Sequence, residues 1–222
     1  MKNIINITEL LKGMCIIGLY YLLATIYAIP FTFFINENNQ GLINLLYSLA
    51  LTFTFSLIYI KDLIKDFKNF KKEYLKIAFN YWLKGLFIMI TSSIILNLFH
   101  LGLTTNEEVN RSLINSYPIT EIISAVLIAP LMEELVFRRS LKKFTNNIHI
   151  YAFTTGLIFG FIHIISSLSN PLSLLFLIPY SAMGIAFGYA YFKTDNIYTT
   201  ISAHSFHNLI TIIELIIVGG IL

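Results

Sequence analysis

Long apolar runs separated by short polar segments form the dominant pattern of this 222-residue chain. A helix that crosses a bilayer needs about 20 mainly apolar residues, and seven runs approach that length. They cover residues 13–35, 41–60, 78–101, 118–138, 148–169, 171–192 and 197–218. The pattern predicts an all-α membrane protein, a polytopic bundle of about seven transmembrane helices. Because no connection is long enough for a soluble domain, we expect a single transmembrane domain over residues 1–222.

Composition supports the membrane interpretation. The chain is 56% hydrophobic and only 12% charged, with a mean hydropathy of +0.74, whereas ordinary soluble domains are about 25% charged. The single cysteine, Cys15, lies inside the first apolar run. It allows neither an intramolecular disulfide nor a cysteine-based zinc site, and we interpret it as a small packing residue.

The lysines and arginines predict how the chain is oriented. If the N-terminus is cytoplasmic, 13 of the 15 Lys and Arg residues flank spans on that side, beginning with Lys2 and Lys12. Short cytoplasmic loops carry such an excess, so we expect a multi-pass protein of the cell membrane with a cytoplasmic N-terminus. The basic residues form no continuous stripe of the kind that binds nucleic acid. The lysine-rich segment 61–76 is also a candidate amphipathic stretch for anionic lipid, in which we expect four side chains to be partly buried: Leu63, Ile64, Phe67 and Phe70.

Two adjacent carboxylates, Glu133 and Glu134, stand near the end of the apolar run 118–138. Ionisable groups within membrane helices are costly, and they indicate a functional site by default. Arg138 lies one helical turn after Glu134 and can pair with it, which leaves Glu133 free for chemistry. Pro130 removes a backbone hydrogen bond and should bend the helix just before the acids.

Two later spans carry further polar groups. His163 lies in the fifth apolar run, while His204 and Asn208 lie one helical turn apart in the seventh and share a face. A lone histidine in a membrane helix is more often a packing residue than a functional one. The combination with Glu133 and Glu134 is costly to keep in lipid, so we expect these groups to converge on one site.

Three motifs in this order resemble a known family. Glu133-Glu134-x-x-x-Arg138, Phe159-x-x-x-His163 and His204-x-x-x-Asn208 are similar to those of the type II CAAX prenyl endopeptidase and bacteriocin-processing family of intramembrane proteases. The resemblance covers the C-terminal half of the chain and marks residues 118–218 as a protease core. It implies hydrolysis of a peptide bond near the cytoplasmic membrane face, without a covalent acyl-enzyme.

The resemblance also implies a role for each matching residue. Glu133 would be the general base that activates water, and His163 would hold or polarise that water. His204 and Asn208 would stabilise the oxyanion. The supporting residues would be Glu134 and Arg138. The implied partners are a peptide or membrane-protein substrate and the lipid bilayer, and no cofactor is implied.

Alternatives remain open at the level of the sequence. Glutamate and histidine can ligate zinc, so a zinc mechanism is the second choice; the His-Glu-x-x-His motif of helical zinc proteases is absent from the sequence. A non-catalytic immunity or scaffold protein of the same family is the alternative function. A small proton-coupled transporter is a third possibility, but no internal repeat supports it. The substrate class also stays open among CAAX-type, leader-peptide and bacteriocin processing or self-immunity.

Overall fold

The computed structural model describes residues 4–36 and 38–219. Lys2 and the extreme ends of the predicted domain 1–222 therefore lie outside the described residues. Apart from one isolated β-bridge between Ile5 and Thr145, the regular structure of the described part is helical. The elements are α1 (Ile7–Thr32), α2 (Gln40–Ile58), α3 (Ile60–Lys68), α4 (Lys72–Leu98), α5 (Thr105–Ser116), α6 (Pro118–Ile123), the π-helical η1 (Ser124–Ile128), α7 (Ala129–Glu134), the π-helical η2 (Leu135–Arg139), α8 (Ile148–Ile164), the 3-10 turns η3 (Ile165–Ser167) and η4 (Pro171–Phe176), α9 (Leu177–Thr194) and α10 (Ile197–Gly219).

Six helical segments in the described part are long and apolar enough to cross a membrane. They are α1, α2, α4, α8 with η3, η4 with α9, and α10. The remaining predicted span, 118–138, is a run of consecutive segments from α6 through η2, and none of these alone has spanning length. The prediction of an all-α, polytopic membrane bundle is confirmed. The chain is a multi-pass membrane protein.

Several predicted ends were wrong. The first helix begins before residue 13, because α1 starts at Ile7 after the Asn6 side chain caps its first turn. The predicted connection 61–77 contains α3 and the first turn of α4, and the connection 102–117 contains α5. Counting apolar residues locates the hydrocarbon region, whereas a helix continues into polar sequence for as long as its backbone hydrogen bonds are satisfied.

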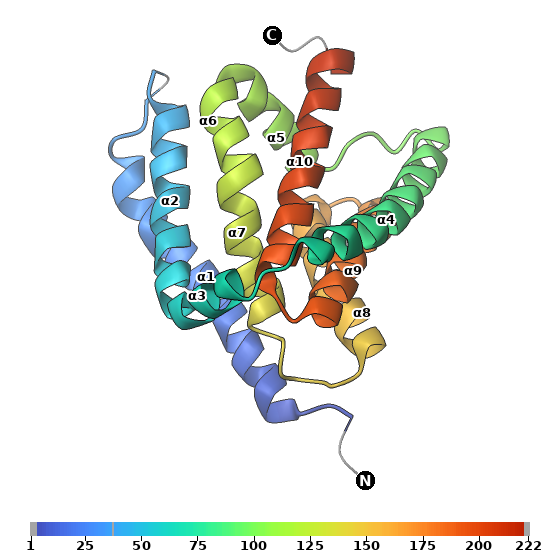
Figure 1. The fold of residues 1–222 in the computed structure, drawn as a ribbon. Helices are drawn as coiled ribbons and strands as arrows, with labels where there is room; N and C mark the ends of the chain where they lie inside the picture. Colours follow the sequence, from blue (N-terminus) through green and yellow to red (C-terminus); the bar gives the residue numbers. More distant parts are fainter. Residues whose placement is uncertain (1–3, 37, 220–222) are drawn as a thin grey trace.

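Figure 1 shows how the helices are arranged around the polar region. α2, the helix that runs through α6 and α7, and α10 stand side by side, and contacts join α7 to both neighbours. α8 and α9 form the most extensive helix pair, while α4 crosses α9 and projects away from the bundle. α3 lies across one end of α2. α7 and α10, which carry the acids and His204, are therefore neighbours, and α8 packs against α9.

Small residues allow α8 and α9 to approach each other closely. A Cβ added at Gly184 would lie 2.9 Å from the Gly156 backbone, and one added at Gly160 would lie 2.8 Å from the Ser181 nitrogen. Glycine at helix contacts permits this approach in membranes, where packing replaces the hydrophobic effect. The closely packed pair forms a wall that carries His163 and Phe159 on α8.

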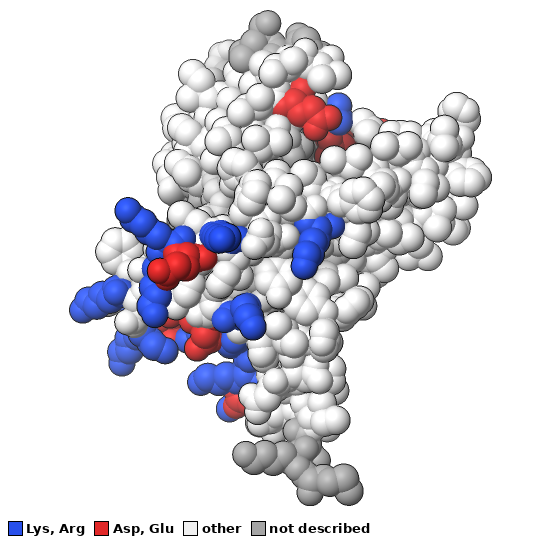
Figure 2. Space-filling view, turned by 45° about the vertical axis from the view of Figure 1, so that its right-hand side comes forward, with Lys and Arg blue, Asp and Glu red and all other residues white. Residues whose placement is uncertain are grey.

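The surface agrees with a membrane environment. Large apolar side chains are exposed along the spans, including Phe87 at 69%, Leu98 at 73% and Ile217 at 75%. Lys and Arg side chains gather over one region of the face drawn in Figure 2, and most of the remaining surface in that view is uncharged. Such segregation is expected when hydrocarbon covers the apolar band and charged groups stay in the aqueous boundary.

Candidate active site

π-helical turns lie on both sides of the short helix that carries the two acids. In η1 the Ala129 N–H bonds to the Ser124 carbonyl, five residues earlier, and in η2 the Ser140 N–H bonds to the Leu135 carbonyl in the same way. π-turns within helices often mark functional sites. Each turn changes the direction in which the following side chains project, so the simple 3.6-residue period does not hold through this span.

Asn208 satisfies a carbonyl that Pro130 leaves without a backbone donor. In the π register of η1, the next bond would join the nitrogen of Pro130 to the Ala125 oxygen, but proline has no N–H. The Ala129 N–H is already used by Ser124. The Asn208 Nδ2 donates a 2.7 Å hydrogen bond to the Ala125 oxygen instead. This contact joins α10 directly to the span that carries the acids.

Glu134 is fully buried and is held from two directions. Its Oε1 accepts a 3.1 Å hydrogen bond from Nδ1 of His204. Its Oε2 lies 3.7 Å from Nε of Arg138. An ionised carboxylate can only accept hydrogen bonds, so Nδ1 of His204 carries a proton in this contact. Glu134 thereby orients the His204 ring.

The Glu133 carboxylate has room for a further partner. Its Oε2 is buried and has no hydrogen-bond partner among the described residues, although the side chain as a whole is 20% exposed. The same oxygen lies 3.8 Å from Nε2 of His204. A gap of this length between two polar groups suits a bridging water. His204 thus stands between the carboxylates, with one ring nitrogen toward each.

Arg138 lies inside the protein with no exposed side-chain area. Besides Glu134, its guanidinium contacts the Gly184 carbonyl at 3.4 Å and stacks 4.5 Å over the Phe159 ring. Its own carbonyl accepts a 2.7 Å hydrogen bond from the Tyr151 hydroxyl. A buried positive charge needs such compensation, and these contacts tie η2 to the wall formed by α8 and α9.

His163 has one ring nitrogen held and the other available. Its Nδ1 lies 2.8 Å from the Phe159 carbonyl oxygen, which can only accept, so Nδ1 is the donor. In a neutral ring Nε2 is then an acceptor. The ring stacks on Tyr180, with the centroids 5.3 Å apart, and interacts electrostatically with Glu133. Phe159 packs against both His163 and His204, so His163 lies near the group formed by Glu133, Glu134, Arg138 and His204, whereas the side chain of Asn208 contacts Ala125.

No group of three His, Cys, Asp or Glu side chains in the described part of the chain is arranged to hold a metal ion. The charges next to Glu134 explain why this site suits a cation poorly. One of its oxygens is used by His204, and the other faces the positive charge of Arg138. A second cation at this point would be repelled by the guanidinium.

Comparison with known proteins identifies the family. The model of a family described as "Type II CAAX prenyl endopeptidase Rce1-like" matches residues 115–210, which include all six predicted site residues. Residues 115–210 are therefore similar to that family. The family resemblance inferred from the three motifs is confirmed.

Two curated relatives align with a longer part of the chain than the family model does. An uncharacterized protein of Mycoplasma capricolum is 32% identical over 204 residues, which covers 82% of this chain and 59% of the relative. A Bacillus subtilis protein named "Putative membrane peptidase YdiL" is 27% identical over 156 residues, covering 66% of this chain and 60% of the relative. The chain thus spans about 60% of the length of each relative. No solved structure matches the chain significantly.

The Rce1-like core has contacts that the motifs alone did not indicate. Trp82 on α4 donates a 3.4 Å hydrogen bond from Nε1 to Nδ1 of His207, next to Asn208. Asp62 on α3 forms an ion pair with Arg139 at the end of η2. The sequence signals were a lone tryptophan inside an apolar run and an acid within a lysine-rich segment. Neither one specifies its partner, because the partners are far apart in the chain.

α3 makes a second contact with the core at the start of α10. The Asp66 carboxylate accepts a 2.9 Å hydrogen bond from the Ile197 N–H, and the Asp66 carbonyl accepts a 2.6 Å bond from the Asn196 side chain. Burial raises the pKa of Asp66, and the Ile197 hydrogen bond partly opposes that rise. The carboxylate thereby satisfies one of the free N–H groups at the start of the helix that carries His204.

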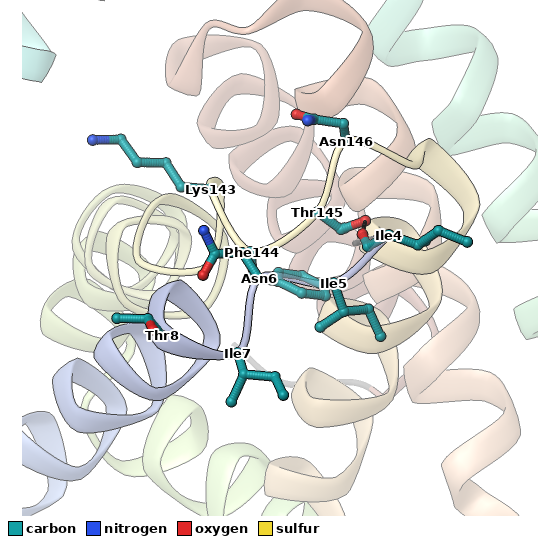
Figure 3. A pocket seen from close by; sticks show the side chains of 9 residues that line it. All are labelled: Ile4, Ile5, Asn6, Ile7, Thr8, Lys143, Phe144, Thr145 and Asn146. Atoms are coloured by element: carbon teal, nitrogen blue, oxygen red, sulfur yellow. Dashed lines mark hydrogen bonds between the residues drawn. The ribbon is translucent and has the colours of Figure 1, made fainter. Parts of the chain in front are cut away.

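Two hollows in the described surface are not lined by the acid cluster. One, of about 460 Å³, lies between the N-terminal segment Ile4–Thr8 and the loop Lys143–Asn146, where the Thr145 hydroxyl bonds to the Ile4 carbonyl (Figure 3). The other, of about 290 Å³, lies between α4 and α10 and is mainly apolar. The first hollow is formed around the β-bridge that attaches the N-terminal segment to the core.

Proposed function

We propose that the protein is an intramembrane endopeptidase in which Glu133 activates water for attack on a peptide bond. The observation that carries this proposal is the buried Oε2 of Glu133, which has no hydrogen-bond partner among the described residues and lies 3.8 Å from Nε2 of His204. A general base needs an acceptor within reach of a water. The match to the Rce1-like endopeptidase family supports the same chemistry.

The proposed reaction uses the groups as follows. Glu133 takes a proton from water as the water oxygen attacks the substrate carbonyl carbon, and Nε2 of neutral His163 accepts a hydrogen bond from the same water. A protonated His204 donates from Nε2 to the developing oxyanion, while Nδ1 stays on Glu134. Each such donor contributes about 3 kcal/mol to the transition state. Glu133 then returns the proton to the leaving amine as the C–N bond breaks.

Asn208 enters the proposal with one of its two amide hydrogens already used. One N–H of Nδ2 bonds to Ala125, so the second remains for the oxyanion. We infer that Asn208 combines both roles, because the bond to Ala125 fixes the amide in position. Glu134 and Arg138 are the positioning residues, since they contact His204 and the wall of α8 and α9 rather than the reacting atoms.

The test is cleavage of a fluorogenic, membrane-anchored peptide library by the purified full chain in liposomes. We expect Glu133→Gln, His163→Ala and His204→Ala to lose activity by about 100-fold or more. Glu214→Gln and His149→Ala apply the same chemical changes to exposed residues and should keep it. Activity that resists a chelator supports the metal-free reaction, whereas chelator-sensitive activity restored by zinc would replace it with the zinc mechanism.

The outcome of this experiment also separates the enzyme from a scaffold. A wild-type protein that cleaves nothing, with site variants that keep the cellular phenotype, would favour a non-catalytic immunity or scaffold function. Full activity in Glu133→Gln would contradict the assignment of the base. A CAAX-type peptide, a leader peptide and a bacteriocin precursor are the substrates to compare in the library.

We propose further that the N-terminus and the lysine-rich end of the bundle face the cytoplasm. The gathering of Lys and Arg in Figure 2 supports this orientation by the positive-inside rule. In a Cys15→Ser background, Lys143→Cys and Arg111→Cys place one thiol in a connection predicted to be cytoplasmic and one in a connection predicted to be external. An impermeant maleimide added to intact cells should label only Arg111→Cys; labelling of only Lys143→Cys would reverse the topology.

A further inference from the structure

The short helix α3 divides its side chains among three sectors. At about 100° per residue, Leu63 and Asp66 face inward and are buried. A second sector exposes apolar side chains: Ile60, Ile64 and Phe67. A third exposes three lysines: Lys61, Lys65 and Lys68. The prediction that Leu63 contacts lipid was therefore wrong, whereas Phe67 is 71% exposed. A helix with adjacent apolar and basic faces suits a membrane surface.

The position of α3 in the chain places it at the bilayer boundary. Only Tyr59 separates it from the span α2, and α4 begins four residues after α3 ends. Both of its ends are therefore tied to membrane-crossing helices. The exposed apolar sector lies beside the basic sector, which allows side chains to enter the acyl region while the lysines stay among the headgroups.

The exposed side chains of residues 61–76 carry mainly positive charge. Between residues 61 and 76 the chain has six lysines, and two of the three acids, Asp62 and Asp66, bond to Arg139 and to the start of α10. Glu73 is exposed. The exposed side of this segment therefore has more lysines than acids, and its net positive charge is complementary to an anionic surface.

The inward acids connect this surface to both parts of the candidate site. Asp62 pairs with Arg139, which follows Arg138 in η2. Asp66 bonds to the first turn of α10, seven residues before His204. A displacement of α3 would therefore act on the acid-bearing span and on the histidine-bearing helix together.

We propose that α3 is a binding surface for anionic phospholipid headgroups and that its occupancy holds η2 and α10 in the arrangement described above. The regulatory part rests on the proposed peptidase function; the lipid surface does not. An acidic segment of a protein could also meet the lysines, but the adjoining apolar sector and the attachment of α3 to two spans favour lipid.

The first experiment measures lipid association without any cleavage. The full chain is reconstituted in phosphatidylcholine, and the association of spin-labelled phosphatidylglycerol is compared with that of spin-labelled phosphatidylcholine. We expect a preference for phosphatidylglycerol. Each lysine near a surface contributes about fivefold, so Lys61→Gln/Lys65→Gln/Lys68→Gln should weaken the preference by up to about 100-fold. Lys143→Gln/Lys193→Gln, which changes exposed lysines outside α3, should largely retain it.

The second experiment measures the coupling. Hydrogen exchange of residues 197–204 is compared in vesicles with and without phosphatidylglycerol. We expect slower exchange with the anionic lipid in the wild type, and no lipid dependence in the triple lysine variant. Asp66→Ala should keep the lipid preference and lose the effect on exchange. Asn196→Ala removes the second hydrogen bond between Asp66 and the start of α10 and serves as a second variant if Asp66→Ala folds poorly.

The results distinguish the parts of the proposal. Equal association of the two spin-labelled lipids would overturn the binding surface, as would a soluble polyglutamate that binds α3 when phosphatidylglycerol does not. A lipid preference with identical exchange in both vesicles would overturn the coupling. If both lipid results hold and no peptide is cleaved, only the peptidase proposal fails, because neither measurement depends on catalysis.

Discussion

The Asn208 side chain donates a 2.7 Å hydrogen bond to the carbonyl oxygen of Ala125, 83 residues earlier in the chain. This carbonyl lacks a backbone donor because Pro130 follows five residues later and the Ala129 N–H is used elsewhere. The asparagine of one helix therefore supplies the donor that the proline of another lacks. The bond between Asn208 and Ala125 joins the acid-bearing span to the helix of His204.

Asn208→Ala should lower the free energy of unfolding by about 1–3 kcal/mol, because a carbonyl in a low-dielectric region loses its donor. Thermal unfolding in detergent measures the change. Asn80→Ala removes an exposed asparagine from α4 and should alter stability by less than about 0.5 kcal/mol. Equal effects of the two substitutions would show that the bond to Ala125 contributes nothing specific.

Arg138→Met should be strongly destabilising, by about 3–5 kcal/mol, since it leaves the buried Glu134 without its cation. Adding Glu134→Gln removes the uncompensated charge, so the double variant should be more stable than Arg138→Met alone. Arg111 and Glu107 form an exposed pair with the same four-residue spacing, and Arg111→Met should cost no more than about 1 kcal/mol. Denaturant titration of the three variants and the wild type checks this order. A double variant less stable than Arg138→Met would contradict the electrostatic explanation.

Gly156→Ala should disrupt the pair of α8 and α9. The new Cβ would lie 2.5 Å from the backbone nitrogen of Ile185, and overpacking of this kind costs about 1–3 kcal/mol or more. Gly18→Ala is the matched control, because nothing lies within 4 Å of its added Cβ. There we expect a gain of about 0.4–1 kcal/mol from the lower entropy of the unfolded chain. A neutral Gly156→Ala in thermal unfolding would mean that the two helices can separate without cost.

Trp82 provides a spectroscopic test of the contact between α4 and α10. It is the single tryptophan of the chain, and its indole N–H donates to His207. His207→Leu should shift the emission to shorter wavelength and lower stability by about 0.5–1.5 kcal/mol, since a polar partner of the indole is removed. His149→Leu, at an exposed histidine, should leave the emission unchanged. An unchanged spectrum in His207→Leu would indicate that the indole is not hydrogen-bonded in solution.

Much of the candidate site could be predicted because its residues violate the hydrophobic pattern. Glu133, Glu134 and His204 are expensive in hydrocarbon, so their presence is informative without any structure. The pairing of Glu134 with Arg138 follows from a spacing of four residues on one helix. The contacts of Asp62 and Trp82 could not be predicted, because no periodicity connects residues that meet only after the helices pack.

The sequence by itself determined the class of protein, the approximate spans and the family, because the length of apolar runs and the cost of buried charge act locally along the chain. Tertiary structure decided which oxygen of Glu134 faces His204 and why Asn208 bonds to Ala125. It also decided how α3 contacts both η2 and the start of α10. The π-turns around α7 shift the helical period, and close packing of α8 on α9 sets the position of Phe159 and His163. These relationships depend on interatomic distances between separate helices, which only the packed bundle specifies.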